Sequence, residues 1–206
     1  ETVLKNGMNT DIQWELLIET AFLDRICLTE NGHYATQIIN FDKSKETGHP
    51  FAYHVYGTAI VTVTLDCIRG TYEFDDVKIV HDFGNSMNTS IDNGQVEGAV
   101  VQGIGWTTME EVSFGKDGKL LSNSLSTYKV PDIYSVPKNI EIKALKTDGP
   151  EFALLRSKAI GEPPFMYGIG AYFALIKAIR AFNPNYKIDF DSPLTPEKVL
   201  MRLYQE

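Results

Sequence analysis

The residues with the clearest potential for chemistry lie in one stretch, Ser157 to Tyr167, in which Glu162 precedes two consecutive prolines. Proline disfavours helical geometry in the preceding residue but suits the first turn of a helix. Glu162 is therefore predicted at a sharp entry into the apolar run Gly168 to Phe182. An ionisable carboxylate is thereby fixed at a loop-to-helix junction. The local pattern by itself favours a helix-start acid, which the helix dipole stabilises by about 0.3 to 1 kcal/mol.

A second group with hydrogen-bonding potential, Gln95, lies in a glycine-punctuated segment whose helical spacing runs from Asp92 to Val112. Asp92 is predicted to cap this helix, which places Gln95 in the first turn with an amide that can donate and accept. Spacing alone favours an exposed first-turn residue with no special role. Three interior glycines, each costing about 1 kcal/mol relative to alanine, indicate close backbone approach by either a crossing helix or a ligand: Gly98, Gly103 and Gly105.

The chain offers no other familiar chemical motif. Its four histidines are scattered without metal-ligand spacing, and Cys27 and Cys67 are far apart, so neither a zinc ribbon, an iron–sulfur site nor a disulfide framework is expected. A Walker loop, a dinucleotide-binding glycine motif and a serine-nucleophile elbow are also absent from the sequence. The low cysteine content fits a reducing compartment, and we expect a cytoplasmic location.

Composition narrows the class of protein further. The 206 residues are 43% hydrophobic and 22% charged, which is ordinary for a globular chain able to bury a core. A net charge of -8 argues against nucleic acid as a partner. No stretch reaches the roughly 20 apolar residues expected of a membrane span. Glu1 opens the chain without a signal pattern or an initiator methionine, and we therefore expect a piece of a longer protein.

The predicted elements alternate between helix and strand. Spacing indicates an amphipathic helix over residues 12 to 25, a short strand over 34 to 40, and a long hairpin over 53 to 82 that is bulged near Gly57. A further strand over 140 to 145, a largely buried helix over 164 to 182, and a final helix with Thr195 as N-cap and Pro196 in its first position follow. The long hairpin argues against a doubly wound parallel sheet and favours an α+β fold.

Four segments with matching order resemble the C-terminal end of the molybdenum-binding region of the molybdenum hydroxylase family, to which xanthine dehydrogenases belong. They are Gly94-Gln95-Val96-Glu97-Gly98-Ala99 with Gln102-Gly103, Ser126-Thr127-Tyr128-Lys129-Val130-Pro131, Ser157-Lys158-Ala159-Ile160-Gly161-Glu162-Pro163-Pro164, and Asp191-Ser192-Pro193-Leu194-Thr195-Pro196-Glu197-Lys198. Three upstream segments are also similar to the same region: Ala21 to Arg25, Gly48 to Tyr53 and Leu65 to Gly70. The resemblance covers nearly the whole chain, so residues 1 to 206 are expected to form the C-terminal portion of one molybdopterin-binding domain without an internal boundary.

The resemblance implies an antiparallel, hairpin-rich sheet packed against long helices, and a molybdenum-pterin cofactor whose metal is held by the pterin and not by protein side chains. It implies that Glu162 is the general base of the hydroxylation, and that Gln95 contacts the amide edge of the pterin. Gly94 and Gly98 would permit close approach. For Lys158, Thr127 and Tyr128 motif membership implies no more than packing or support.

The resemblance also implies the partners. The family's other cofactor and substrate loops lie upstream of these residues, and its FAD and [2Fe-2S] clusters lie on other domains or subunits. We therefore expect the chain to need the upstream part of the domain and an iron–sulfur/FAD partner, to lack hydroxylase activity alone, and to self-associate as a homo-oligomer through uncovered helix faces.

The expected parent reaction is hydroxylation of hypoxanthine or xanthine to uric acid with water as the oxygen source. Pro163 after the glutamate favours purine, because relatives that oxidise aldehydes tend to carry another residue there. An aldehyde or N-heterocycle oxidoreductase is the alternative within the family. A non-enzymatic assembly or dimerisation module is the alternative from a different class.

Overall fold

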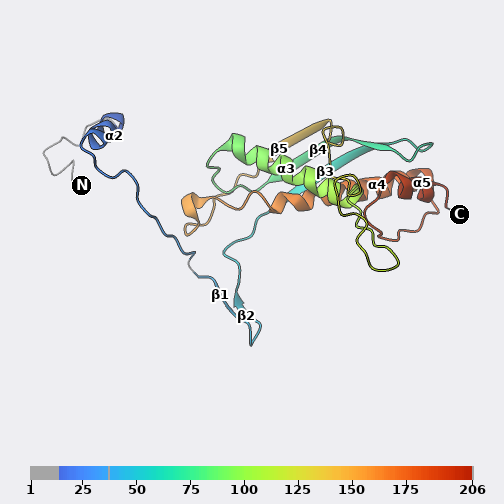
Figure 1. Cartoon of the computed structure of the whole chain (residues 1–206), viewed down its shortest axis with the longest axis horizontal. Coiled ribbons are helices and arrows are strands. Elements are labelled where there is room, and N and C mark those ends of the chain that lie inside the picture. Colours follow the sequence, from blue (N-terminus) through green and yellow to red (C-terminus); the bar gives the residue numbers. More distant parts are fainter. Residues whose placement is uncertain (1–13, 37, 206) are drawn as a thin grey trace. The chain divides into compact units, whose positions relative to one another are not determined.

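The computed structural model describes residues 14–36 and 38–205, which divide into two compact units, Glu1–Gln37 and Ile38–Glu206. In the first unit, helix α2 spans Trp14–Leu23 and buries Ala21 (Figure 1). The predicted helix over 12 to 25 is confirmed between these bounds, while Ile12 lies outside the described residues. The predicted strand over 34 to 40 is wrong for residues 34–36, which carry no strand.

The second unit opens with a small antiparallel ladder between β1 (Asn40–Asp42) and β2 (Thr47–His49), both exposed. Ile38 lies just before β1 with a φ of 64°, in the left-handed region that a β-branched residue rarely adopts. This turn at Ile38 interrupts the strand predicted over 34 to 40. The β1–β2 ladder therefore starts only at Asn40.

A three-stranded sheet forms the centre of this unit. β3 (Gly57–Leu65) and β4 (Tyr72–His81) make the predicted hairpin, and β5 (Asn139–Ala144) adds to β4 in parallel, in the order β3-β4-β5. The ladder irregularity lies between Thr62 and Val63, so the bulge expected near Gly57 is wrong. Gly57 instead leaves room for the Tyr167 hydroxyl, which a Cβ would strike. The α+β class is confirmed, whereas the described residues do not confirm a hairpin-rich sheet.

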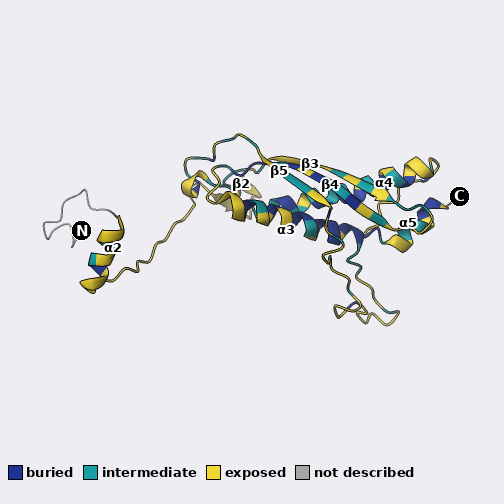
Figure 2. Cartoon of the chain, turned by 90° about the horizontal axis from the view of Figure 1, so that it is seen from above, coloured by how far each residue is buried: buried dark blue, intermediate teal, exposed yellow. Residues whose placement is uncertain are grey.

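Two helices lie along the sheet and against each other: α3 (Thr89–Thr108) and α4 (Ile169–Phe182), the latter preceded by the 3-10 helix η2 (Pro163–Gly168) (Figure 1). Figure 2 shows buried positions gathered along β4 and along one side of α3. The core shared by sheet and helices includes Val77, Ile79, Val96, Val100, Ile104, Leu175, Ile176, Ile179, Leu194, Val199 and Leu203.

The glycines of α3 divide into two groups. A Cβ on Gly103 would meet the Phe165 carbonyl oxygen and the Gly168 backbone, and one on Gly105 would meet Pro131. These two glycines are therefore explained by a close crossing of α3 with η2 and by packing on a loop. Gly94 and Gly98 have no neighbouring atom within 4 Å of such a Cβ, so packing does not explain them.

The run Pro163–Phe182 has the length and hydropathy of a membrane-spanning helix, with a mean hydropathy of 1.3, which differs from the expectation that no stretch comes close. The buried side of α4, with Leu175 and Ile179, packs into the core against β3. Core packing accounts for the apolar residues on that side only, since 33% of the most apolar window is buried and Phe173 and Phe182 are about half exposed, so the prediction of a largely buried helix is wrong.

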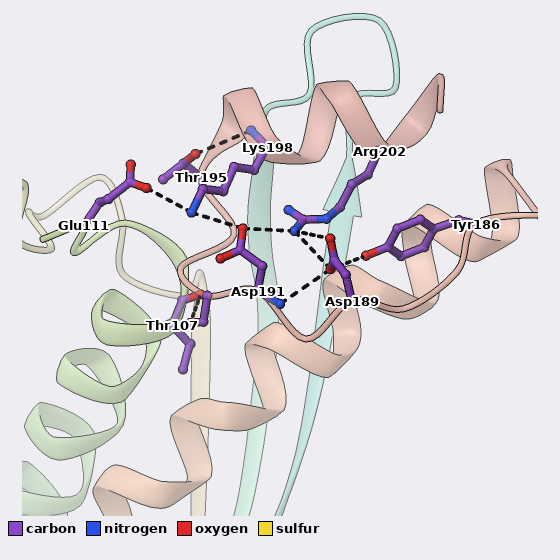
Figure 3. Close-up of polar contacts among 9 residues, drawn as sticks. Thr107, Glu111, Tyr186, Asp189, Asp191, Thr195, Lys198 and Arg202 are labelled. Carbon is purple, nitrogen blue, oxygen red and sulfur yellow. Dashed lines mark hydrogen bonds and ion pairs between the residues drawn. The ribbon is translucent and has the colours of Figure 1, made fainter. Parts of the chain in front are cut away.

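The last helix, α5 (Pro196–Leu203), begins as predicted, with the Thr195 hydroxyl accepting a hydrogen bond from the Lys198 backbone nitrogen at 3.4 Å. A charged cluster ties this helix to the rest of the unit (Figure 3). Arg202 Nη2 donates to Asp189 at 2.9 and 3.0 Å and to Asp191 at 3.1 Å. Lys198 bridges Asp191 at 3.2 Å and Glu111, just beyond the end of α3, at 2.9 Å. We call these five residues the Arg202 cluster.

Candidate active site

Glu162 occupies the N-cap position of η2, where it is exposed and makes no capping hydrogen bond through its side chain. Its backbone has φ −100° and ψ −42°, so the expected departure from helical geometry before a proline is wrong. The turn is closed by a hydrogen bond from the Phe165 nitrogen to the Glu162 carbonyl oxygen at 3.1 Å, which offsets the steric preference. The carboxylate is therefore not occupied in starting the helix.

The backbone before Glu162 is held against the loop that precedes α3. Lys158 donates its backbone N–H to the Phe83 carbonyl at 3.1 Å, Asn85 donates to the Arg156 carbonyl at 2.9 Å, and Gly84 and Ser157 form an antiparallel bridge. Backbone pairing thus joins the loop that precedes α3 to the segment that precedes Glu162.

Lys158 adds a buried ion pair to this join. Its Nζ lies 2.5 Å from Asp82 Oδ2, and the side chains are 8% and 0% exposed. Burial opposes ionisation of Asp82, but hydrogen bonds from Lys158 and from the Thr147 hydroxyl, at 2.5 Å, outweigh it and hold the pKa of Asp82 below its ordinary value. Lys158 therefore supports the segment that carries Glu162, and its single positive charge is paired with the negative charge of Asp82.

Helix α3 begins four residues earlier than the sequence indicated. Asn88 is the N-cap, with its Oδ1 accepting from the Ile91 nitrogen at 3.2 Å, so the prediction that Asp92 caps the helix is wrong. Asp92 is instead buried in the first turn, where it accepts a hydrogen bond from the Ser86 hydroxyl at 2.5 Å. Gln95 consequently lies in the second turn and not in the first.

The structure brings Gln95 to the residue that precedes Glu162. Gln95 Oε1 lies 3.5 Å from the position that a Cβ on Gly161 would occupy. Gln95 and Glu162 are exposed, and Gly94 and Gly98 leave open space on α3 beside Gln95. An amide with donors and an acceptor, on a helix whose backbone is unobstructed at two glycines, thereby lies next to the backbone that leads into Glu162.

The other motif residues have local partners. The Tyr128 hydroxyl donates to Glu110 Oε2 at 2.5 Å, which raises the pKa of Tyr128, and the Thr127 hydroxyl donates to the Ser124 carbonyl at 3.2 Å. These contacts support packing roles for both. No group of three or more His, Cys, Asp or Glu side chains suited to a metal ion occurs within residues 14–36 and 38–205.

Sequence reasoning missed two residues near the site, His81 and Tyr167. His81 is fully buried, and its Nδ1 lies 2.7 Å from the Tyr167 hydroxyl. The strand pattern held a signal: Val77, Ile79 and His81 alternate along β4, which places a histidine on the inward face of the strand. Its partner on η2 could not be read from the same pattern.

Comparison with known proteins places the chain in a family. Residues 1–137 match the family described as molybdopterin cofactor-binding domain. Over 97% of its length the chain is 38% identical to the xanthine dehydrogenase/oxidase of Felis catus and, over 97%, 36% identical to aldehyde oxidase 1 of Rattus norvegicus. It spans 16% and 15% of the length of these relatives.

Solved structures agree with the sequence comparisons. The quinoline 2-oxidoreductase from Pseudomonas putida 86 superposes with a TM-score of 0.62 and 28% identity, covering 69% of this chain and 18% of that one. The aldehyde oxidoreductase from Desulfovibrio gigas superposes with a TM-score of 0.64 and 27% identity, covering 76% and 16%. The chain therefore belongs to the molybdopterin cofactor-binding domain family, whose cofactor is molybdopterin.

Proposed function

We propose that residues 1–206 form the C-terminal portion of the molybdopterin-binding domain of a molybdenum hydroxylase that converts hypoxanthine and xanthine to uric acid, with water as the oxygen source. The observation that carries the proposal is the approach of the Gln95 amide to Gly161, the residue before Glu162. Two motifs separated by more than 60 residues in the sequence meet there, and each contributes a polar side chain without a packing role.

In this proposal Glu162 is the general base and Gln95 holds the cofactor. A general base needs an oxygen that is not engaged elsewhere, and Glu162 makes no capping hydrogen bond. The Gln95 amide can pair with a ring edge that both donates and accepts, and the open space at Gly94 and Gly98 lets a flat group approach the helix backbone. The molybdenum-pterin cofactor, when bound, supplies the oxidising centre. The chain's own contribution is a Glu162 carboxylate oxygen that accepts a proton.

Purine is the proposed substrate class. The support is Pro163 after Glu162, a position at which the aldehyde-oxidising relatives tend to differ. The identities to a xanthine dehydrogenase/oxidase and to an aldehyde oxidase, 38% and 36%, are close, so aldehydes or N-heterocycles are the alternative substrates. A comparison of xanthine, an aldehyde and quinoline as substrates of the complete enzyme distinguishes them.

The proposed site needs more protein than this chain. Gln95 and Glu162 are exposed, and apolar side chains near them are also uncovered: Ile91 at 61%, Trp106 at 48% and Met166 at 57%. Exposed apolar patches favour association, so we propose that the upstream part of the domain covers this face and that an iron–sulfur/FAD partner and a second copy complete the enzyme. A purely structural assembly module would use the same face without turnover.

Two measurements test the proposal. Molybdenum and pterin content together with xanthine-dependent dye reduction are measured for the isolated chain and for the complete enzyme that contains it. We expect cofactor and turnover only in the complete enzyme; stoichiometric cofactor and turnover from the chain alone would contradict the need for partners.

A variant pair tests the role of Glu162. Glu162→Gln in the complete enzyme should lower kcat by about 10²- to 10⁴-fold, the usual contribution of a general base, while molybdenum content is unchanged. Glu46→Gln, at an exposed turn between β1 and β2, is the matched control and should turn over normally. Full activity of Glu162→Gln would refute the proposed base, and a complete enzyme that binds no cofactor would favour the assembly module.

A further inference from the structure

His81 and Asp82 are consecutive residues at the end of β4, and both side chains are fully buried. They contact side chains that flank Glu162 in the sequence: Asp82 binds Lys158, four residues before it, and His81 binds Tyr167, five residues after it. One end of one strand therefore holds both sides of the segment that carries the proposed base.

The contact on the N-terminal side of Glu162 is an ion pair in which both carboxylate oxygens of Asp82 accept hydrogen bonds. Asp82 Oδ2 accepts from Lys158 Nζ at 2.5 Å, while Oδ1 accepts from the Thr147 hydroxyl at 2.5 Å and the Gly84 nitrogen at 3.1 Å. Lys158 Nζ also donates to the His54 carbonyl at 3.1 Å. With these directed bonds made away from water, the position of Lys158 is defined closely.

The contact on the C-terminal side is a single hydrogen bond between aromatic side chains. His81 Nδ1 and the Tyr167 hydroxyl are 2.7 Å apart, and the rings meet edge to face with centroids 5.7 Å apart. The Tyr167 hydroxyl also packs against Gly57, where a Cβ atom would collide with it. Burial lowers the pKa of His81, only partly opposed by Asp82, so the ring is neutral at physiological pH.

We propose that His81 and Asp82, through Tyr167 and Lys158, form a two-point clamp that positions Glu162 for proton transfer. The inference rests on the proposed function, because it assigns these four residues to the placement of the base. Ile160, which packs against the core between the two anchors, removes further freedom. The backbone of Glu162 is thereby fixed while its carboxylate stays free of a helix cap.

Stability alone does not account for the clamp. Buried ion pairs can often be replaced by apolar residues without loss of stability, because desolvation offsets much of their attraction. His81 Nε2 is buried without a partner, which is a cost that an apolar residue would avoid. Directed polar contacts supply one advantage that apolar packing lacks, because they define the position of the segment they hold. That matters for catalysis, since misplacement of a reacting group by about 1 Å can lower a rate by about 10²-fold.

Tyr167→Phe is the sharpest test, because it removes one hydroxyl and keeps the ring. In the 206-residue chain, we expect exchange of the hydrogen-bonded backbone amides of Lys158 and Phe165 to become about tenfold faster, as the loss of one hydrogen bond allows, while α5 amides are unchanged. Tyr186→Phe is the matched control, since the Tyr186 hydroxyl donates to Asp189 at 3.0 Å in the Arg202 cluster (Figure 3).

In the complete enzyme, Tyr167→Phe should lower kcat about 10- to 100-fold with KM unchanged and should shift the acid limb of the pH–rate profile. His81→Leu should behave similarly, and His81→Asn, which retains an amide near the Nδ1 position, should recover part of the loss. If Tyr167→Phe and His81→Leu both show the amide exchange and the kcat of wild type while Glu162→Gln is inactive, the clamp is refuted and the proposed base stands. An active Glu162→Gln overturns the proposed base, and with it the assignment of the clamp to catalysis.

Discussion

Two charged clusters in the second unit, the Asp82–Lys158 pair and the Arg202 cluster, have similar residues and different surroundings. Asp82 and Lys158 are at most 8% exposed, whereas Asp189 and Asp191, the partners of Arg202, are each 49% exposed. The buried pair joins segments 76 residues apart and adjoins the proposed site, while the Arg202 cluster joins residues near the C-terminus and the end of α3. The burial of the charges, and not their number, distinguishes the Asp82–Lys158 pair, which defines the position of a segment, from the Arg202 cluster, which attaches α5.

The largest difference should come from breaking the buried pair. Lys158→Met leaves the Asp82 carboxylate buried and unpaired, which should lower the free energy of unfolding by about 3 to 5 kcal/mol. Urea unfolding of the chain measures it. The double variant Asp82→Leu/Lys158→Met, which removes both charges, should recover most of the loss; a double variant as unstable as Lys158→Met would contradict the account.

Arg202→Met should have the next largest effect. Arg202 is itself 6% exposed and donates to two carboxylates, but those carboxylates are half in water, so the expected loss is about 1 to 3 kcal/mol. Added salt should reduce the difference from wild type, whereas it should change the effect of Lys158→Met little. Equal salt sensitivity of the two variants would remove the distinction by burial.

The pH dependence of stability should also separate the two regions. The folded-state pKa of His81 lies below the ordinary 6.5 because of burial, so the unfolded chain binds more protons as the pH falls. The contribution of His81 is complete above pH 6.5 and is lost as the pH falls through its folded-state pKa. The pKa values of Asp82 and Asp189 lie below 3.8, so the stabilisation from these two carboxylates is complete above pH 3.8 and is lost only as the pH falls through their folded-state pKa values. Between pH 7 and pH 5 the unfolding free energy of wild type should fall relative to that of His81→Phe, which cannot titrate at this position; parallel curves would contradict this assignment.

The smallest effect is expected from Lys198→Met. Lys198 bridges Glu111 and Asp191, which are 44% and 49% exposed, and such pairs contribute about 0 to 1 kcal/mol. A thermal unfolding midpoint within about 4 °C of wild type would agree. A loss as large as that of Arg202→Met would mean that the cluster acts as one unit, which the corresponding double variant would reveal as non-additivity.

Local sequence patterns predicted the elements that local forces specify. The hairpin of β3 and β4, the start of α5 at Thr195 and the strand β5 follow from alternation, capping and proline placement, which act within a few residues. The N-cap of α3 was missed because Asn88 and Asp92 are both suitable caps, and only the hydrogen bond from Ser86 to Asp92 decides between them.

The motifs around Gln95 and Glu162 predicted both the family and the proposed site from the sequence, because residue types and spacing within a motif are local. Tertiary structure alone decided how those motifs are held together. The approach of Gln95 to Gly161, the burial of Lys158 on Asp82 and the contact of His81 with Tyr167 each join residues more than 60 positions apart. No local periodicity encodes such contacts, because they depend on how α3, η2 and the end of β4 pack around a common core.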